Sequence, residues 1–211
     1  GESAAATIAG WLTGSRNYVL AFDAPLGWPA ALGVTLASHR AGASIDVDAD
    51  RLFSRETDRF VRTALGKRPL EVGADRIART ARAALDLLGE IRAAAGLPLP
   101  LAWKAGKASG VIEVYPAATL LSRDISPAGY KGDTRPARTA RASMLERLRP
   151  EFRTSISADL LVEDDDILDA VVCMLAAADF ARGDAIAPED RTRARREGWI
   201  WFRGRAQRKL F

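Results

Sequence analysis

The amino-acid sequence predicts a single α/β domain. Residues 18–22 form a near-continuous apolar run, which is typical of a strand in a sheet covered on both faces. A second strand is expected over residues 111–115, and several segments have apolar residues at helical spacing. The 211 residues suffice for one core, and the sequence has neither internal repeats nor a low-complexity linker. We therefore expect one domain over residues 1–211.

The first half of the chain predicts one strand among helices. A helix over residues 4–12 precedes the strand 18–22, which ends where two prolines and a glycine force a loop. Small and acidic residues predict an exposed loop over residues 41–50. Ser54 is the expected N-cap of a following helix. The helices expected in this half after the strand cover residues 32–39, 54–65 and 74–95.

The second half predicts a strand, an apolar helix and an aromatic strand. Pro116 stops the strand 111–115, and a loop is expected over residues 126–136. Residues 166–181 form the most apolar helix, which places the only cysteine, Cys173, in the core. Further helices are expected over residues 117–121 and 139–148, and a short aromatic strand over residues 199–202.

Composition and charge narrow the class of protein. No apolar run approaches the roughly 20 residues of a membrane span. A single cysteine excludes an internal disulfide, and with no signal peptide in view we expect a cytoplasmic protein. The net charge of +4 and the basic segments 135–149 and 191–208 suit a phosphate-rich partner. Solvated helix faces in an arginine-rich protein explain the same charge, so charge alone does not decide.

Acidic residues at the ends of apolar elements are the strongest chemical signal. Asp23 and Glu113 close the two predicted strands, residues 164–166 are all aspartate, and Asp169 lies one turn inside the apolar helix. Buried carboxylates are costly unless they are paired, hydrogen-bonded or bound to a metal. Oxygen ligands suit Mg²⁺ or Mn²⁺, and one histidine and one cysteine disfavour zinc.

Each acidic group also has a structural explanation. Asp23 can form a turn before Pro25, and the aspartates at 164–166 can cap a helix and complement its dipole. Glu113 either faces a site or pairs with an arginine. Neither capping nor the dipole explains Asp169, which interrupts an otherwise apolar helix.

Seven short motifs resemble the DUF429 family of bacterial and archaeal proteins. They occur in the family's order and are Ala21–Pro29, Arg55–Asp58, Ala74–Arg76, Glu113–Ala118, Tyr130–Gly132, Asp166–Ala170 and Arg196–Ile200. The family is identified as one of predicted nucleases, which implies an RNase H-like mixed sheet flanked by helices, here with a helical insertion at approximately 51–109. Family members open with a strand bearing an acidic residue, whereas this chain begins at the following helix. This implies either a segment preceding the sequence or a degraded site.

The resemblance implies a metal-dependent nuclease or phosphoryl-transfer enzyme. In an RNase H-like sheet Asp23 would lie near the start of the last long helix, so Asp23, Asp166 and Asp169 are the expected ligands of Mg²⁺ or Mn²⁺, with Glu113 as a further catalytic group. The side chains expected to contact substrate phosphates, or each other, are Arg55, Asp58, Arg76 and Lys131. Arg55 and Asp58, three residues apart, would otherwise form only a helix-surface ion pair.

Other readings of the same residues stay open. The alternative function is a non-catalytic module that binds a nucleic acid or nucleotide on the same fold. An enzyme acting on a small molecule ranks third, because the sequence lacks a glycine-rich phosphate loop. Resolvase-like members of the fold act as dimers, which leaves a homodimer open. Trp28, Trp199 and Trp201 can stack on a base, although the last two are better explained by covering a sheet edge.

Overall fold

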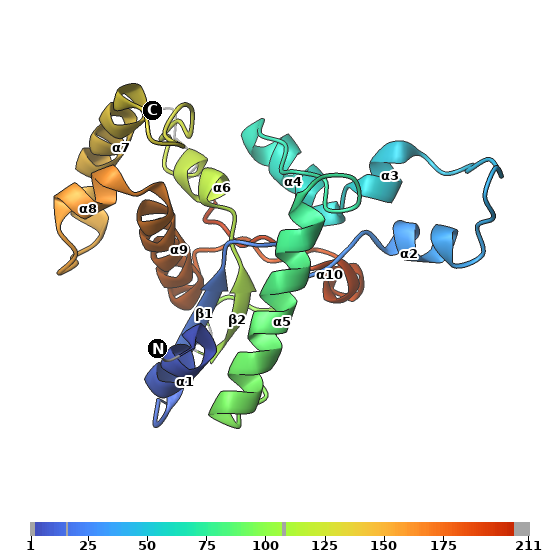
Figure 1. The fold of residues 1–211 in the computed structure, drawn as a ribbon, viewed down its shortest axis with the longest axis horizontal. Coiled ribbons are helices and arrows are strands. Elements are labelled where there is room, and N and C mark those ends of the chain that lie inside the picture. The colour runs from blue at the N-terminus through green and yellow to red at the C-terminus, as the bar shows by residue number, and fades with distance from the viewer. Residues whose placement is uncertain (1–2, 16, 107–108, 205–211) are drawn as a thin grey trace, which may run out of the picture.

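Two parallel strands form the centre of the molecule, which is a computed structural model describing residues 3–15, 17–106 and 109–204. Strand β1 (Tyr18–Phe22) pairs with β2 (Ser109–Glu113), so that Tyr18 lies opposite Ser109 and Phe22 opposite Glu113. Helices surround this small sheet (Figure 1). The predicted α/β class is confirmed, and both strands are present: β1 has the predicted bounds, and β2 lies two residues before the predicted 111–115.

Ten helices and one 3₁₀ turn make up the rest of the described secondary structure. They are α1 (Ala4–Leu12), α2 (Ala30–Ala37), α3 (Ala49–Phe53), α4 (Glu56–Leu65), α5 (Ile77–Ala95), α6 (Pro116–Leu121), α7 (Arg135–Leu148), η1 (Arg149–Glu151), α8 (Ala158–Glu163), α9 (Asp165–Arg182) and α10 (Arg191–Glu197). All the helices predicted from the sequence are present: α1 has the predicted bounds, and each of the others is shifted at one or both ends. The short helices α3, α8 and α10 were not predicted.

The predicted N-cap of α4 is wrong. Ser54 closes α3, and α4 begins two residues later at Glu56. The backbone N–H of Arg55 donates to Oδ2 of Asp58 at 2.9 Å, so a carboxylate inside the first turn stabilises the start of the helix. Sequence spacing placed the cap on the wrong polar residue.

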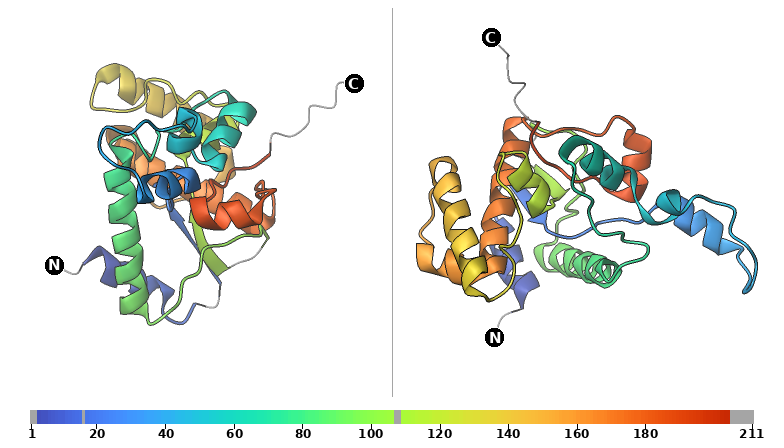
Figure 2. Two further views of the ribbon diagram at one scale, coloured as in Figure 1. Left: turned by 90° about the vertical axis from the view of Figure 1, so that its right-hand side faces the viewer. Right: turned by 90° about the horizontal axis from the view of Figure 1, so that it is seen from above.

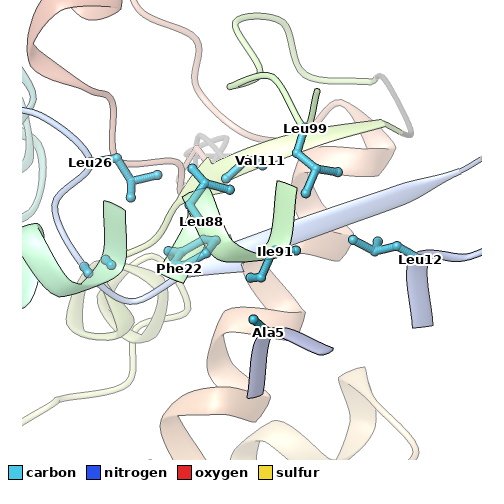
Figure 3. Packing of buried hydrophobic residues seen from close by; sticks show 10 residues of the cluster. Ala5, Leu12, Phe22, Leu26, Leu88, Ile91, Leu99 and Val111 are labelled. Carbon is cyan, nitrogen blue, oxygen red and sulfur yellow. The ribbon is translucent and has the colours of Figure 1, made fainter. Parts of the chain in front are cut away.

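Helices cover both faces of the sheet, as the apolar run in β1 predicted. Leu20 and Phe22 point to the side where α1 and α5 pack, and Val19 and Ala21 point to the side of α9. Figure 2 shows these two layers, and Figure 3 shows the side chains of the α1–α5 side. Cys173 is buried on the α9 side, as predicted.

Residues 199–202 run beside β2 but are not a strand, so this prediction is wrong. Glu113 and Ile200 form one isolated parallel bridge, and the N–H of Trp201 donates to the carbonyl of Glu113 at 2.9 Å. Trp199 and Trp201 are buried, and Trp201 packs edge-on against Phe180. These two indoles cover the sheet edge and present no face to a base.

The predicted insertion at 51–109 holds α4 and α5. Helix α5 packs on α1 and on the sheet, whereas α4 contacts α6 and α10. Helices α2 and α3 extend away from the sheet together (Figure 1). Within the described residues, no helix combines the length and apolarity that crossing a membrane requires.

The α5 side of the core predicts a stability difference. Leu88 is 1% exposed between α5 and the sheet, whereas Leu160 on α8 is 51% exposed. Leu88→Ala should lower the free energy of unfolding by about 2–5 kcal/mol in urea denaturation, because it leaves a cavity. Leu160→Ala should change it by less than about 0.5 kcal/mol. Equal effects of the two substitutions would contradict this packing.

Candidate functional site

The ends of the two strands bring acidic residues to one edge of the sheet. Because the strands are parallel, Asp23 after β1 and Glu113 at the end of β2 lie at the same edge. Alternation along β1 places Asp23 on the side of Val19 and Ala21, where α9 packs. Asp169 of α9 acts electrostatically on Asp23 from that side.

Asp169 is buried and held by two side chains from one loop. The hydroxyl of Tyr130 donates to its Oδ1 at 2.8 Å, and Nζ of Lys131 contacts its Oδ2. Burial raises the pKa of Asp169, against the opposing effect of Lys131 and Tyr130. Partial burial alone would lower the pKa of Lys131, but Asp169 and its acidic neighbours raise it. Lys131 therefore stays charged among the carboxylates.

No side chain among the described residues binds the carboxylate of Asp23 as Tyr130 and Lys131 bind that of Asp169. Asp23 has no hydrogen bond or ion pair within the part of the chain that the structure describes, and neighbouring groups crowd its carboxyl group although part of the residue is exposed. Loss of water around the carboxyl group, followed by the negative charge of Asp169, raises the pKa of Asp23 to about 7. Lys131 opposes this shift without cancelling it. The site thus carries more negative charge than its own cation neutralises.

A buried arginine that sequence reasoning missed holds the loop of Tyr130 and Lys131. Arg141 of α7 is fully buried and donates to the carbonyls of Tyr130 and Gly132 at 2.6 and 2.8 Å. It also donates to the carbonyls of Val162 and Glu163 at 2.5 and 3.2 Å, just before α9. The loop and the end of α8, which leads into α9, are therefore held by the same side chain.

Glu113 faces an arginine, one of the two possibilities that the sequence left open. Its Oε1 and Oε2 accept from Nη2 and Nη1 of Arg55 at 2.7 and 2.9 Å, and Oε2 also accepts from the N–H of Leu26. Nε and Nη2 of Arg55 bind Asp58 as well. The Arg55–Asp58 pair is buried, so its interpretation as a helix-surface pair is wrong. Burial disfavours charge on Arg55, but Glu113 and Asp58 raise its pKa.

The three consecutive aspartates at the start of α9 have different environments. Oδ1 of Asp164 accepts from the N–H groups of Asp166 and Ile167, so Asp164 caps the helix. Oδ2 of Asp165 accepts from the N–H of Gly132, which ties α9 to the lysine loop. The side chain of Asp166 is 92% exposed and lies 3.7 Å from Nζ of Lys131. Asp165, more than the predicted ligand Asp166, belongs to the buried part of the site.

Four of the predicted residues come together, and others do not join them. Asp23, Asp169 and Lys131 form one group with Asp166 at its outer edge, whereas Arg55, Asp58 and Glu113 form a second, buried group. Arg76 is exposed at the start of α5. The roles assigned to all these residues stay predictions.

A small pocket adjoins Asp23. Its volume is about 90 Å³, and it lies between the loop after β1, the end of β2 and the segment before α5. The residues that line it are Asp23, Ala24, Pro25, Arg55, Pro69, Leu70, Ile77, Glu113, Val114, Tyr115 and Ile200. Its walls are mostly apolar, and of its charged groups Asp23 and Glu113 come from the two strand ends and Arg55 from the start of α4.

The electrostatics of Asp23 can be tested by titration. NMR of the side-chain carboxyl carbon should give a pKa of about 7, and Asp169→Asn should lower it by removing a neighbouring negative charge. Since folding raises this pKa, the contribution of Asp23 to stability is fully present below 3.8 and is lost as the pH rises through about 7. Asp23→Asn should remove that loss. The exposed Asp159→Asn on α8 is the control, and an Asp23 pKa near 4 in the parent would contradict the arrangement.

Comparison with known proteins places the chain in a family without a known activity. No curated protein and no solved structure matches the chain. A family model described as a protein of unknown function, DUF429, matches residues 3–193. This confirms the family resemblance of the sequence motifs. Because the match covers most of the sequence, the chain belongs to the DUF429 family.

Proposed function

We propose that this protein is a metal-dependent hydrolase of phosphodiester bonds in nucleic acid, with Asp23 and Asp169 as shared ligands of Mg²⁺ or Mn²⁺. One observation carries the proposal. Two carboxylates distant in the sequence lie near each other at the end of β1, and loss of water around Asp23, followed by repulsion from Asp169, raises the pKa of Asp23 to about 7. A divalent cation between them would remove that repulsion.

The donor set fits a hard cation. Both residues offer carboxylate oxygens, Asp23 has no competing hydrogen bond among the described residues, and Asp165 and Asp166 add charge nearby. The nearest thiol, Cys173, is buried, and burial raises its pKa, so it does not supply a thiolate for zinc. Lys131 would have to share Asp169 with the metal, because its Nζ already contacts Oδ2.

Besides holding the metal, side chains of the protein would orient its ligands and neutralise the substrate. When bound, the metal would polarise a phosphoryl oxygen and lower the pKa of a bound water. Tyr130 fixes the orientation of Asp169 through its hydroxyl. Lys131 lies half-exposed beside the carboxylates and would neutralise a phosphate oxygen. Arg141 keeps Tyr130 in place by donating a hydrogen bond to the backbone carbonyl of Tyr130.

An RNase H-like arrangement is part of this proposal. It is supported by parallel strands that end in acidic residues and by a long helix whose Asp169 reaches the first of them. Nucleic acid as substrate is supported by exposed arginines that form no ion pair among the described residues. They include Arg76, Arg79, Arg191, Arg195 and Arg196.

Calorimetric titration with Mn²⁺ tests the metal site. The parent chain should bind Mn²⁺, and Asp23→Asn and Asp169→Asn should each weaken binding by at least about tenfold, or ~1.4 kcal/mol, because each removes a ligand. Asp159→Asn removes an exposed aspartate of α8 and should leave the affinity unchanged. Mn²⁺-dependent cleavage of labelled single-stranded DNA and RNA should follow the same order and stop with EDTA.

Two results would contradict the proposal in different ways. If the parent fails to bind Mn²⁺, or both variants bind as well as the parent, Asp23 and Asp169 are not the ligands. If Mn²⁺ binds as expected but oligonucleotides are bound and never cleaved, the non-catalytic binding module replaces the hydrolase.

A further inference from the structure

We infer that the pocket beside Asp23 takes one unpaired base of a nucleic-acid strand whose backbone phosphate lies at the carboxylates. The inference rests on the proposed function and adds a substrate class, namely single-stranded nucleic acid or a base turned out of a duplex. It starts from the position of the pocket, since Asp23 belongs both to the pocket wall and to the carboxylate group.

The walls of the pocket suit a flat apolar ring. Pro25, Pro69, Ile77 and Val114 contribute aliphatic surface from three separate segments. Leu70 also lines the pocket and is 59% exposed, so its apolar side chain is accessible to a ligand. A base seated in the pocket would cover Leu70 and bury apolar surface on both partners.

The size of the pocket limits what enters. The volume of the pocket is about 90 Å³. That room admits a single small ring and excludes a stacked base pair. A base inside a duplex has both faces covered and cannot reach such a pocket unless it is unpaired or flipped.

A polar group is available to read the edge of the ring. Tyr115 lines the pocket, and its hydroxyl has no hydrogen-bond partner in the described part of the chain. Burial, followed by the charge of Asp23, raises the pKa of Tyr115, so the hydroxyl keeps its proton at neutral pH. The other polar groups, Arg55 and Glu113, are bound to each other at the back of the pocket.

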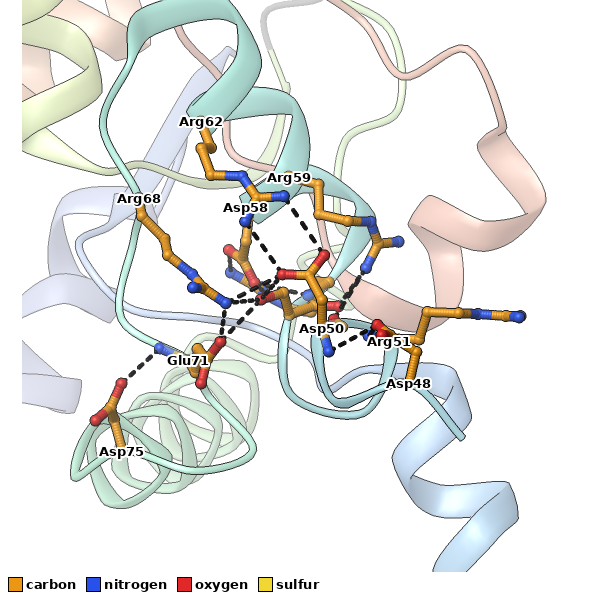
Figure 4. A network of polar contacts seen from close by, with 11 residues as sticks. Asp48, Asp50, Arg51, Asp58, Arg59, Arg62, Arg68, Glu71 and Asp75 are labelled. Carbon is orange, nitrogen blue, oxygen red and sulfur yellow. Dashed lines mark hydrogen bonds and ion pairs between the residues drawn. The ribbon is translucent and has the colours of Figure 1, made fainter. Parts of the chain in front are cut away.

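Arg76 is a cation next in the sequence to a residue that lines the pocket. Arg76 directly precedes the pocket residue Ile77 at the start of α5, is exposed and has no ion pair within the described ranges. In contrast, Arg62 and Arg68 are both paired with Asp50, as Figure 4 shows. Arg76 and the N-terminus of the 19-residue helix α5 therefore provide positive charge for a second phosphate.

Binding of labelled oligonucleotides tests the inference. The three probes, each twelve nucleotides long, are a single strand of deoxycytidines, an abasic strand and a duplex. Their affinities are compared by fluorescence anisotropy, with Ca²⁺ in place of Mn²⁺ to limit cleavage. The parent should bind the deoxycytidine strand about tenfold more tightly than the abasic strand of equal charge, because only the former offers a ring. The duplex should bind with an affinity closer to that of the abasic strand.

Two variants assign the preference to the pocket. Ile77→Trp fills the pocket and Leu70→Ser removes its apolar edge, so both should abolish the tenfold preference without changing the abasic affinity. Leu160→Ser on α8, also an exposed leucine, should keep the preference. Unchanged Mn²⁺ affinity and thermal midpoint show that the variants are folded with their carboxylates intact.

The possible outcomes separate the inference from the proposed function. Equal affinity of the parent for the base-bearing and abasic strands overturns the pocket inference but leaves the metal-dependent hydrolase standing. A preference that survives in both variants overturns it as well, because the base then binds elsewhere. Absence of binding to every probe overturns it together with nucleic acid as the substrate, while Mn²⁺ titration still tests the metal site.

Discussion

The fully buried guanidinium of Arg55 is the interaction on which the functional end of the sheet depends. All five of its N–H groups are used, two by Glu113, two by Asp58 and one by the carbonyl of Glu197. One side chain thereby joins β2, the start of α4 and the end of α10. The fit is close, since a Cβ on Gly198 would lie 2.8 Å from Oε2 of Glu113. Burying these charges is tolerable only because every partner is in place.

That network separates the acidic residues into two kinds. The carboxylate oxygens of Glu113 accept hydrogen bonds from Arg55 and from the N–H of Leu26. Glu113 therefore orders the loop that carries Asp23. Asp23 is left without a partner among the described residues, and Asp169 meets it from α9. Arg55 neutralises the structural carboxylates Glu113 and Asp58, whereas Asp23, one of the pair that we assign to the metal, has no ion-pair partner among the described residues. Uncompensated charge of this kind is typical of functional sites.

Sequence patterns predicted the elements that depend on local chemistry. The apolar run of β1 and the stripe of α9 indicated the central layers, and Asp23 and Asp169 were noticeable because they interrupt or end such runs. Contacts between distant segments were not predictable. Arg141 binds only backbone carbonyls, which have no sequence signature, and the burial of Arg55 depends on partners 58 and 142 residues away. Propensity likewise favoured a strand at 199–202, where tertiary packing allows only isolated bridges.

The most direct test of the account is the position of Mn²⁺ in a crystal of the protein, located by its anomalous diffraction. The account predicts an anomalous peak in coordination distance of carboxylate oxygens of both Asp23 and Asp169, with Lys131 displaced from one oxygen of Asp169. A peak bound only by Asp164, Asp165 and Asp166, or no peak at this edge of the sheet, would contradict it.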